Sequence, residues 1–329
     1  MTVQRAKSGD LAQSLRAGDR RALARAITLA ESTKSADRAE AEDLLTRLLP
    51  HTGHAMRIGI SGAPGAGKST FIEAFGRHLT GLGLKVAVLA VDPSSRRSGG
   101  SILGDKTRME KLARDPNAFI RPSPAGATLG GVARRTREVM LLTEAAGFDV
   151  VIVETVGVGQ SETAIADMAD LFVLLVSPGG GDDLQGIKRG VMELADFVVV
   201  TKADGDLVAA AKRAEADYHA ALHLMRPKYK ALPPRVISVS ALKGAGISDG
   251  WEAMKAFHKG LVDGAHLSRL RADQARRWFW GEVEAVLKDA ILSDPDAARE
   301  ASRVEADVVA GKALPDAAAR DLIRAFRRA

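Results

Sequence analysis

A short apolar stretch that runs directly into a glycine-rich turn constrains this sequence most. Met56–Ser61 is followed by Gly62-Ala-Pro-Gly-Ala-Gly-Lys-Ser-Thr70, a full match to the pattern G-x-x-x-x-G-K-[ST]. In this pattern a strand ends in a loop whose backbone N–H groups surround phosphate oxygens, and a helix follows. The lysine reaches the β- and γ-phosphates, and the serine hydroxyl ligates Mg²⁺. We therefore expect a nucleoside triphosphate to be held by Gly62, Ala63, Pro64, Gly65, Ala66, Gly67, Lys68, Ser69 and Thr70.

Seven short apolar segments alternate with helix-length stretches in the middle of the chain. Continuous apolar strands predict a mostly parallel sheet that is covered by helices on both faces. The two ends show only helical periodicity, with Pro295 and Pro315 as expected helix starts. We expect an α/β P-loop fold with a helical extension (1–54), a nucleotide-binding domain (55–262) and a helical arm (263–329). The expected strands are Arg57–Gly62, Val86–Asp92, Ala118–Pro122, Asp149–Thr155, Leu171–Ser177, Phe197–Lys202 and Arg235–Ala241.

Composition excludes several other classes of protein. The 329 residues include no cysteine, so the chain has no disulfide, no thiolate metal site and no cysteine nucleophile. The net charge of +6 is spread evenly, and only 4% of residues are aromatic, so a nucleic-acid partner is not expected. Apolar runs such as Leu171–Val176 are far shorter than the roughly 18–20 residues of a membrane span. We expect a cytoplasmic protein without a membrane segment or a signal peptide.

Two further strand ends indicate which base is bound. One leads into Thr201-Lys-Ala-Asp204 and the other into Ser240-Ala-Leu242. A carboxylate at Asp204 is able to accept hydrogen bonds from both N1–H and the N2 amine of guanine, a pair of donors that adenine lacks. We expect the stem of Lys202 to lie along the base and the N–H of Ala241 to donate to guanine O6. The motifs therefore predict GTP rather than ATP.

Acidic residues at other strand ends are candidate metal ligands. Asp92 and Glu154 are expected at the carboxyl edge of the sheet, where parallel sheets bind ligands. Asp105 lies in a glycine-rich segment and is a further candidate, because Mg²⁺ prefers oxygen ligands. Solvated surface acids are the alternative interpretation for all three. Histidine pairs at positions 51 and 54 and at 219 and 223 are interpreted as ordinary surface residues, since no third ligand is evident.

Other polar residues near these strand ends are candidates for sensing or catalysis. The N–H of Gly157 is placed to sense the γ-phosphate, and Gln160 is a weaker candidate for orienting water. Lys188 follows the run Gly179-Gly-Gly-Asp-Asp183 and is a candidate for stabilising charge in the transition state. The alternative is that this run is an ordinary surface loop.

These motifs together resemble those of the MeaB/ArgK GTPases, bacterial relatives of the human methylmalonic aciduria type A protein in the SIMIBI class of P-loop GTPases. The resemblance covers nearly the whole chain and is most specific in Glu154-Thr-Val-Gly-Val-Gly-Gln-Ser-Glu162. It also rests on the segments Gly62–Thr70, Val91–Ser95, Gly104–Met109, Thr201–Asp204 and Ser240–Leu242.

The resemblance implies a homodimeric enzyme that hydrolyses GTP to GDP and phosphate. It also implies a chaperone of adenosylcobalamin-dependent methylmalonyl-CoA mutase, which gates cofactor delivery and protects the mutase from inactivation. The arm beyond Leu261 is then expected to mediate dimerisation, with Trp278, Phe279 and Trp280 as apolar candidates. Three alternatives stay open: a metal-insertase-type GTPase, a transport-linked kinase, and a nucleotide-binding module without hydrolysis.

The resemblance also assigns roles to single residues. It implies that Asp92, Asp105 and Glu154 surround Mg²⁺, that residues 179–189 form a switch that reports the nucleotide state, and that Lys68, Asp105, Glu154 and Lys188 serve hydrolysis. Thr201 stands where many GTPases have Asn, so a tether from this side chain to the P-loop is not implied. The start of the P-loop lacks the extra lysine of related GTPases, so we expect slow hydrolysis until a partner supplies or orders the missing groups.

Overall fold

The computed structural model describes residues 2–91, 109–122, 129–155, 161–178 and 189–327. The chain divides into two compact units, residues 1–271 and residues 272–329. Within the described ranges, no helix combines the length and the apolar character that crossing a bilayer requires.

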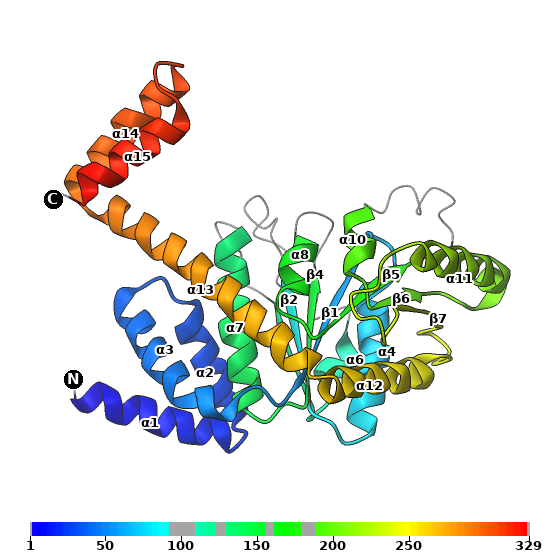
Figure 1. Cartoon of the computed structure of the whole chain (residues 1–329). Coiled ribbons are helices and arrows are strands. Elements are labelled where there is room, and N and C mark those ends of the chain that lie inside the picture. Colours follow the sequence, from blue (N-terminus) through cyan, green and yellow to red (C-terminus); the bar gives the residue numbers. More distant parts are fainter. Residues whose placement is uncertain (1, 92–108, 123–128, 156–160, 179–188, 328–329) are drawn as a thin grey trace. The chain divides into compact units, whose positions relative to one another are not determined.

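A seven-stranded sheet forms the centre of the first unit (Figure 1). Its order is β3-β2-β4-β1-β5-β6-β7, and every pairing is parallel. The prediction of a parallel α/β sheet is confirmed, and each apolar segment expected to be a strand overlaps one. The strands are β1 Met56–Gly62, β2 Val86–Val91, β3 Ala118–Pro122, β4 Val150–Thr155, β5 Leu171–Val176, β6 Phe197–Val200 and β7 Arg235–Ser238.

Helices cover both faces of this sheet. One face packs against α4 (Lys68–Gly81), α6 (Glu110–Ala113) and α12 (Ile247–Asp263). The other packs against α7 (Leu129–Ala145), α8 (Ser161–Ala166), α10 (Arg189–Leu194) and α11 (Val208–His223). Along β4, Val151 and Val153 join the α7 side of the core, whereas Val150 and Ile152 join the α4 side. This burial on both faces explains why the strands read as continuous apolar runs.

The N-terminal helices are part of the first unit. Leu23 and Ile27 are almost completely buried and belong to the same hydrophobic cluster as Leu142 of α7. The Arg38 guanidinium donates two 2.8 Å hydrogen bonds to the Glu138 carboxylate, so α3 is fixed to α7 by a bidentate ion pair. The helices are α1 Thr2–Arg16, α2 Arg20–Glu31 and α3 Ser35–Leu48, and the 3-10 turn Leu49–His51 leads into β1.

A cluster of buried ion pairs lies where β1 and β5 begin. The Asp170 carboxylate accepts hydrogen bonds from the backbone N–H of Arg57 (2.9 Å) and from Nε and Nη2 of Arg271 (2.8 and 2.7 Å). The Arg57 guanidinium in turn donates to Glu144 at 2.7 and 3.0 Å. Burial by itself raises the pKa of Asp170, but the hydrogen bonds and charge of Arg271 outweigh it and lower that pKa. The first unit therefore extends to Arg271, beyond the expected start of the arm at residue 263.

The second unit is helical. It contains most of α13 (His266–Ser293), followed by α14 (Pro295–Val309) and α15 (Pro315–Phe326), which pack against each other. The Asp294 carboxylate caps α14 by accepting hydrogen bonds from the N–H groups of residues 296 and 297 at 2.9 and 2.8 Å. Both prolines that were expected to start helices occupy the first helical position, which suits a residue without an N–H.

Candidate nucleotide-binding site

The glycine-rich turn connects β1 to α4 with a backbone that other residues would not adopt easily. Gly65 and Gly67 have φ values of +82° and +86°, in the left-handed region. Gly62 is required for a different reason, because a Cβ there would lie 2.4 Å from the carbonyl oxygen of Leu175 in β5. Helix α4 begins at Lys68, directly after this turn. The loop and the N-terminal end of a helix are thus arranged as a phosphate-binding P-loop requires.

The Lys68 ammonium lies over the P-loop. Its Nζ donates to the carbonyl oxygens of Gly62 at 2.6 Å and Ala63 at 3.3 Å. Burial lowers the pKa of Lys68, and the negative charges of Glu154 on β4 and Glu162 on α8 oppose that shift. A cation is therefore held at the mouth of the loop, with two buried acids nearby.

Thr201 attaches the end of β6 to the P-loop. Its side chain is buried, and its Oγ1 lies 2.7 Å from the carbonyl oxygen of Ala66 and 3.0 Å from that of Val176. A hydroxyl carries one proton, so it donates to one of these oxygens at a time. The P-loop tether that the resemblance did not imply is present, because a threonine hydroxyl reaches the same kind of carbonyl acceptor that an asparagine amide would.

Lys202 also contacts the P-loop. Its Nζ donates to the carbonyl oxygen of Gly65 at 2.7 Å, and its φ of +55° is unusual for a residue with a side chain. The backbone N–H of Asp204 donates to the carbonyl oxygen of Lys202 at 2.8 Å, which closes the turn. The lysine stem therefore crosses from the end of β6 to the P-loop.

The two motifs that were expected to recognise the base meet at the carboxyl ends of β6 and β7. The hydroxyl of Ser240, which is almost completely buried, donates to Oδ2 of Asp204. The Ser240 hydroxyl also accepts from the backbone N–H of Lys243 at 3.1 Å. Ser240 thus fixes the orientation of the Asp204 carboxylate, whose Oδ1 has no hydrogen-bond partner in the described part of the chain. Ala241 and the strongly exposed Leu242 follow in the same turn.

The expected metal ligands are described only in part. Glu154 is buried near the end of β4, and Ser69 is half-buried in the first turn of α4. Both supply oxygen donors of the kind that Mg²⁺ prefers, so they fit that ion. Among the described residues no group of three or more His, Asp or Glu side chains could hold a metal, and this includes both histidine pairs. Asp92, Asp105, Gly157, Gln160 and Lys188 lie outside the described residues.

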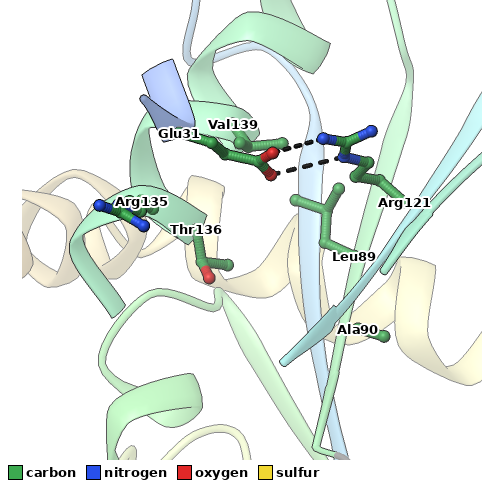
Figure 2. A pocket seen from close by; sticks show the side chains of 7 residues that line it. All are labelled: Glu31, Leu89, Ala90, Arg121, Arg135, Thr136 and Val139. Atoms are coloured by element: carbon green, nitrogen blue, oxygen red, sulfur yellow. Dashed lines mark hydrogen bonds and ion pairs between the residues drawn. The ribbon is translucent and has the colours of Figure 1, made fainter. Parts of the chain in front are cut away.

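A small pocket on the α7 side of the sheet is separate from this site. Figure 2 shows the Glu31 carboxylate paired with the Arg121 guanidinium beside Leu89, Thr136 and Val139. Its volume of about 10 Å³ is room for roughly one water molecule. The pocket is therefore too small for a nucleotide, and its ion pair instead joins α2 to β3.

Sequence reasoning missed three contacts of the site: the tether from Thr201, the contact between Lys202 and Gly65, and the position of Glu162 near Lys68. The signal for the first was present, because a threonine directly after a buried strand has a hydroxyl to donate. The other two depend on how separate loops approach one another, which the local sequence does not specify.

Comparison with known proteins gives a consistent result. The family model described as Methylmalonyl Co-A mutase-associated GTPase MeaB matches residues 23–296. A protein of Caulobacter vibrioides named Putative GTPase is 55% identical over 317 residues, which are 96% of this chain and 97% of that protein. Escherichia coli GTPase ArgK is 49% identical over 294 residues, 89% of each chain.

Two further matches extend the comparison. The Mus musculus protein named Methylmalonic aciduria type A homolog, mitochondrial, is 48% identical over 320 residues, 94% of this chain and 77% of that protein. A solved structure described as the crystal structure of LAO/AO transport system kinase has a TM-score of 0.78 and 40% identity, and the match covers 98% of both chains.

Proposed function

Because the chain belongs to the MeaB family of GTPases, we propose that it acts as a chaperone of adenosylcobalamin-dependent methylmalonyl-CoA mutase. The chain is a GTPase and binds guanine nucleotide, as its family does. In the proposed role, the nucleotide state gates the delivery of intact cofactor and protects the mutase from inactivation. The family description, which names the mutase, supports this partner.

The observation that carries the proposal is the direct connection between base site and phosphate site. Thr201 and Lys202 both contact the P-loop, and Asp204 follows two residues later with its carboxylate oriented by Ser240. Binding guanine at Asp204 therefore constrains the segment that contacts the phosphate-binding loop. Such a connection suits a protein whose shape must report which guanine nucleotide it holds.

Within this site we assign separate tasks to the described residues. Lys68 binds the β- and γ-phosphates, and Ser69 and Glu154 would hold Mg²⁺, which when bound neutralises phosphate charge. Asp204, Ser240, Ala241 and Leu242 surround the base. The roles assigned to Asp92, Asp105, Gly157 and Lys188 belong to the same proposal.

Slow hydrolysis in isolation is part of the same proposal. Ala63 and Pro64 stand where related GTPases carry an extra lysine, and Lys68 is the described cation that donates to the carbonyls at the start of the loop. A partner that supplies or orders further groups is expected to raise the turnover, because phosphoryl transfer depends on positioned charge.

The helical arm is proposed to form a homodimer. Phe279 and Trp280 on α13 are 60% and 58% exposed, whereas the Trp278 indole donates to Glu282 of its own helix at 3.0 Å. A chain that stops after Arg271 keeps the ion pair with Asp170 and tests the arm without removing part of the first unit. Light scattering should show a monomer for this shortened chain and a dimer for the full chain. A shortened chain that remained a dimer would exclude the arm as the interface.

The experiment that tests the function measures GTP and ATP turnover with and without methylmalonyl-CoA mutase, together with co-elution of the two proteins. We expect a nucleotide-dependent complex and a faster GTPase in the presence of the mutase. Absence of a complex together with an unchanged rate would refute the chaperone role. Transfer of the γ-phosphate to a protein rather than to water would instead support the kinase activity named for the similar solved structure.

A further inference from the structure

The two edge strands of the sheet differ in how their outward backbone groups are satisfied. At the β3 edge, the Arg20 guanidinium of α2 donates to the carbonyl oxygens of Ala118 (2.7 Å) and Pro116 (3.1 Å), and Pro122 has no N–H to offer. At the opposite edge, β7 pairs with β6 on one side, and none of the described strands pairs with its other side. An unpaired edge of this kind is able to accept another strand.

The hydrogen bonds to β6 identify the backbone groups that face outward from β7. The N–H of Arg235 donates to the carbonyl oxygen of Asp196, directly before β6, at 3.0 Å, and the N–H of Val239 donates to that of Val200 in β6 at 2.8 Å. Backbone groups alternate in direction along a strand, so those of Val236 and Ser238 point to the free edge. Gly246 approaches the Ser238 carbonyl, because a Cβ at Gly246 would lie 2.4 Å from that oxygen. Within the described ranges of the chain, both backbone groups of Val236 and the N–H of Ser238 are left for pairing.

A groove of about 680 Å³ runs beside this edge. Its walls are mostly apolar and include Leu222 of α11, Met225 and Pro234 from the connecting segment, and Ala253 of α12. In Figure 1, β7 lies between α11 and α12. An added strand would therefore find apolar surface for its side chains next to the backbone groups that it pairs with.

The ionisable side chains that line the groove are all basic. Among the described lining residues, the ionisable side chains are His219, His223 and Arg235, and none is acidic. Arg226 and Lys230 are exposed in the adjacent loop, and neither forms an ion pair with a described residue. The rim therefore favours an acidic occupant, since like charges opposite one another are repelled.

Two acidic residues close to β7 contact other side chains of this chain. Asp196 lies 3.1 Å from Nζ of Lys228, and Glu215 accepts a 2.6 Å hydrogen bond from the hydroxyl of Ser238. The hydrogen bond from the neutral Ser238 hydroxyl leaves the charge of Glu215 in place, but neither acid lines the groove, whose ionisable lining residues are His219, His223 and Arg235.

We propose that the free edge of β7 is a docking site for an extended, acidic segment of a partner protein. The segment adds an eighth strand by exchanging two hydrogen bonds with Val236, and alternate side chains enter the apolar groove while carboxylates face Arg235 and His223. The residues assigned to the nucleotide do not line this groove. The proposal therefore stands or falls separately from the proposed GTPase chaperone role.

The test uses the full chain and a labelled, capped heptapeptide of alternating glutamate and valine, followed by fluorescence anisotropy. We expect saturable binding below about 1 mM, the weak end of specific recognition. Two peptide controls are included: one with lysine for glutamate, and one with methylated amides on the pairing edge. Each control is expected to bind at least about tenfold more weakly, a difference of roughly 1.4 kcal/mol. Absence of binding, or equal binding by either control peptide, would overturn the proposal.

Variants of the chain test the same interface from the other side. Val236→Pro removes an outward N–H at a strand edge that tolerates proline and should weaken binding about tenfold. Arg235→Glu should reverse the preference, so that the lysine peptide binds more tightly than the glutamate peptide. Arg213→Glu makes an equal charge change on an exposed α11 residue outside the groove and should leave the preference as it is.

Two further measurements complete the test. GTP turnover should be unchanged by Arg235→Glu. A smaller oligomer of Val236→Pro in light scattering would show that a second copy occupies the edge and would contradict the proposal.

Discussion

Replacing Asp204 with asparagine is the sharpest test of base recognition. Ser240 donates to Oδ2 of Asp204, so the carboxylate is oriented before any ligand arrives. Guanine is proposed to donate to this carboxylate through N1–H and N2. The substitution keeps the shape of the side chain, removes its negative charge and turns one acceptor into a donor. The Ser240 hydroxyl is able to donate to the remaining amide oxygen, so the fold should be little affected.

The expected loss follows from the hydrogen bonds that change. Each hydrogen bond to a charged group contributes about 1.5–3 kcal/mol, and the amide retains one acceptor of the original two. A loss of about 3 kcal/mol corresponds to a roughly hundredfold weaker dissociation constant for GTP. ATP offers no such pair of donors, so its affinity should be nearly unchanged. Xanthosine triphosphate, which has a carbonyl in place of the guanine amine, should gain affinity because the new amide N–H is able to donate to it.

The assay measures displacement of a fluorescent guanine nucleotide by GTP, ATP and xanthosine triphosphate. Asp206→Asn is the matched control, because Asp206 is an exposed acid two residues further along the chain. Its nucleotide preference should equal that of the unmodified protein. If Asp204→Asn still preferred GTP over ATP by the original factor, the carboxylate would not be the group that reads the base.

Three further substitutions test the surrounding structure. Thr201→Val leaves the carbonyl of Ala66 without its donor and should lower the free energy of unfolding in urea by about 1–3 kcal/mol, whereas Thr201→Ser should restore it. Gly62→Ala should cost a similar amount and weaken nucleotide binding, because its Cβ meets a β5 carbonyl; a fully stable variant would contradict the close approach. Asp170→Asn should cost about 3–5 kcal/mol at neutral pH. Because the folded pKa of Asp170 is lowered, its contribution is present above the ordinary pKa of about 4 and is lost as pH falls below it. Urea unfolding at several pH values should therefore show that the free energy of unfolding falls less steeply below about pH 4 in this variant than in the unmodified protein.

The sequence predicted the sheet well because most of its strands, with β2, β4, β5 and β6 as the clearest cases, are buried on both faces. Segments such as Val150–Thr155 and Leu171–Val176 have no solvent face, so their apolar residues run without interruption. The P-loop was equally predictable, because Gly65 and Gly67 adopt positive φ values that favour glycine whatever the distant parts of the chain do. Local requirements of this kind can be recognised directly in the amino-acid sequence.

Contacts between distant segments could not be predicted in the same way. The Arg271–Asp170 pair joins residues 101 positions apart, and it places the end of the first unit after the expected start of the arm. Arg38 and Glu138 are 100 positions apart and attach the N-terminal helices to α7. An arginine in an amphipathic helix has the same local pattern whether it faces solvent or a buried carboxylate, so periodicity does not distinguish the two.

Thr201 and Lys202 belong to a motif that the sequence predicts, yet they make contacts to a distant segment that it does not predict. The motif from Thr201 to Asp204 was recognised for its aspartate, yet its first two residues hold the P-loop through Ala66 and Gly65. The proposed sites for the base and for the phosphates are therefore connected, because one four-residue segment carries Asp204 and also contacts the P-loop. A change at Asp204 that displaced this turn would also disturb the phosphate loop, whereas one that altered only the carboxylate would not. An unchanged affinity of Asp204→Asn for ATP distinguishes these cases, since ATP is expected to bind the phosphate loop without using the carboxylate.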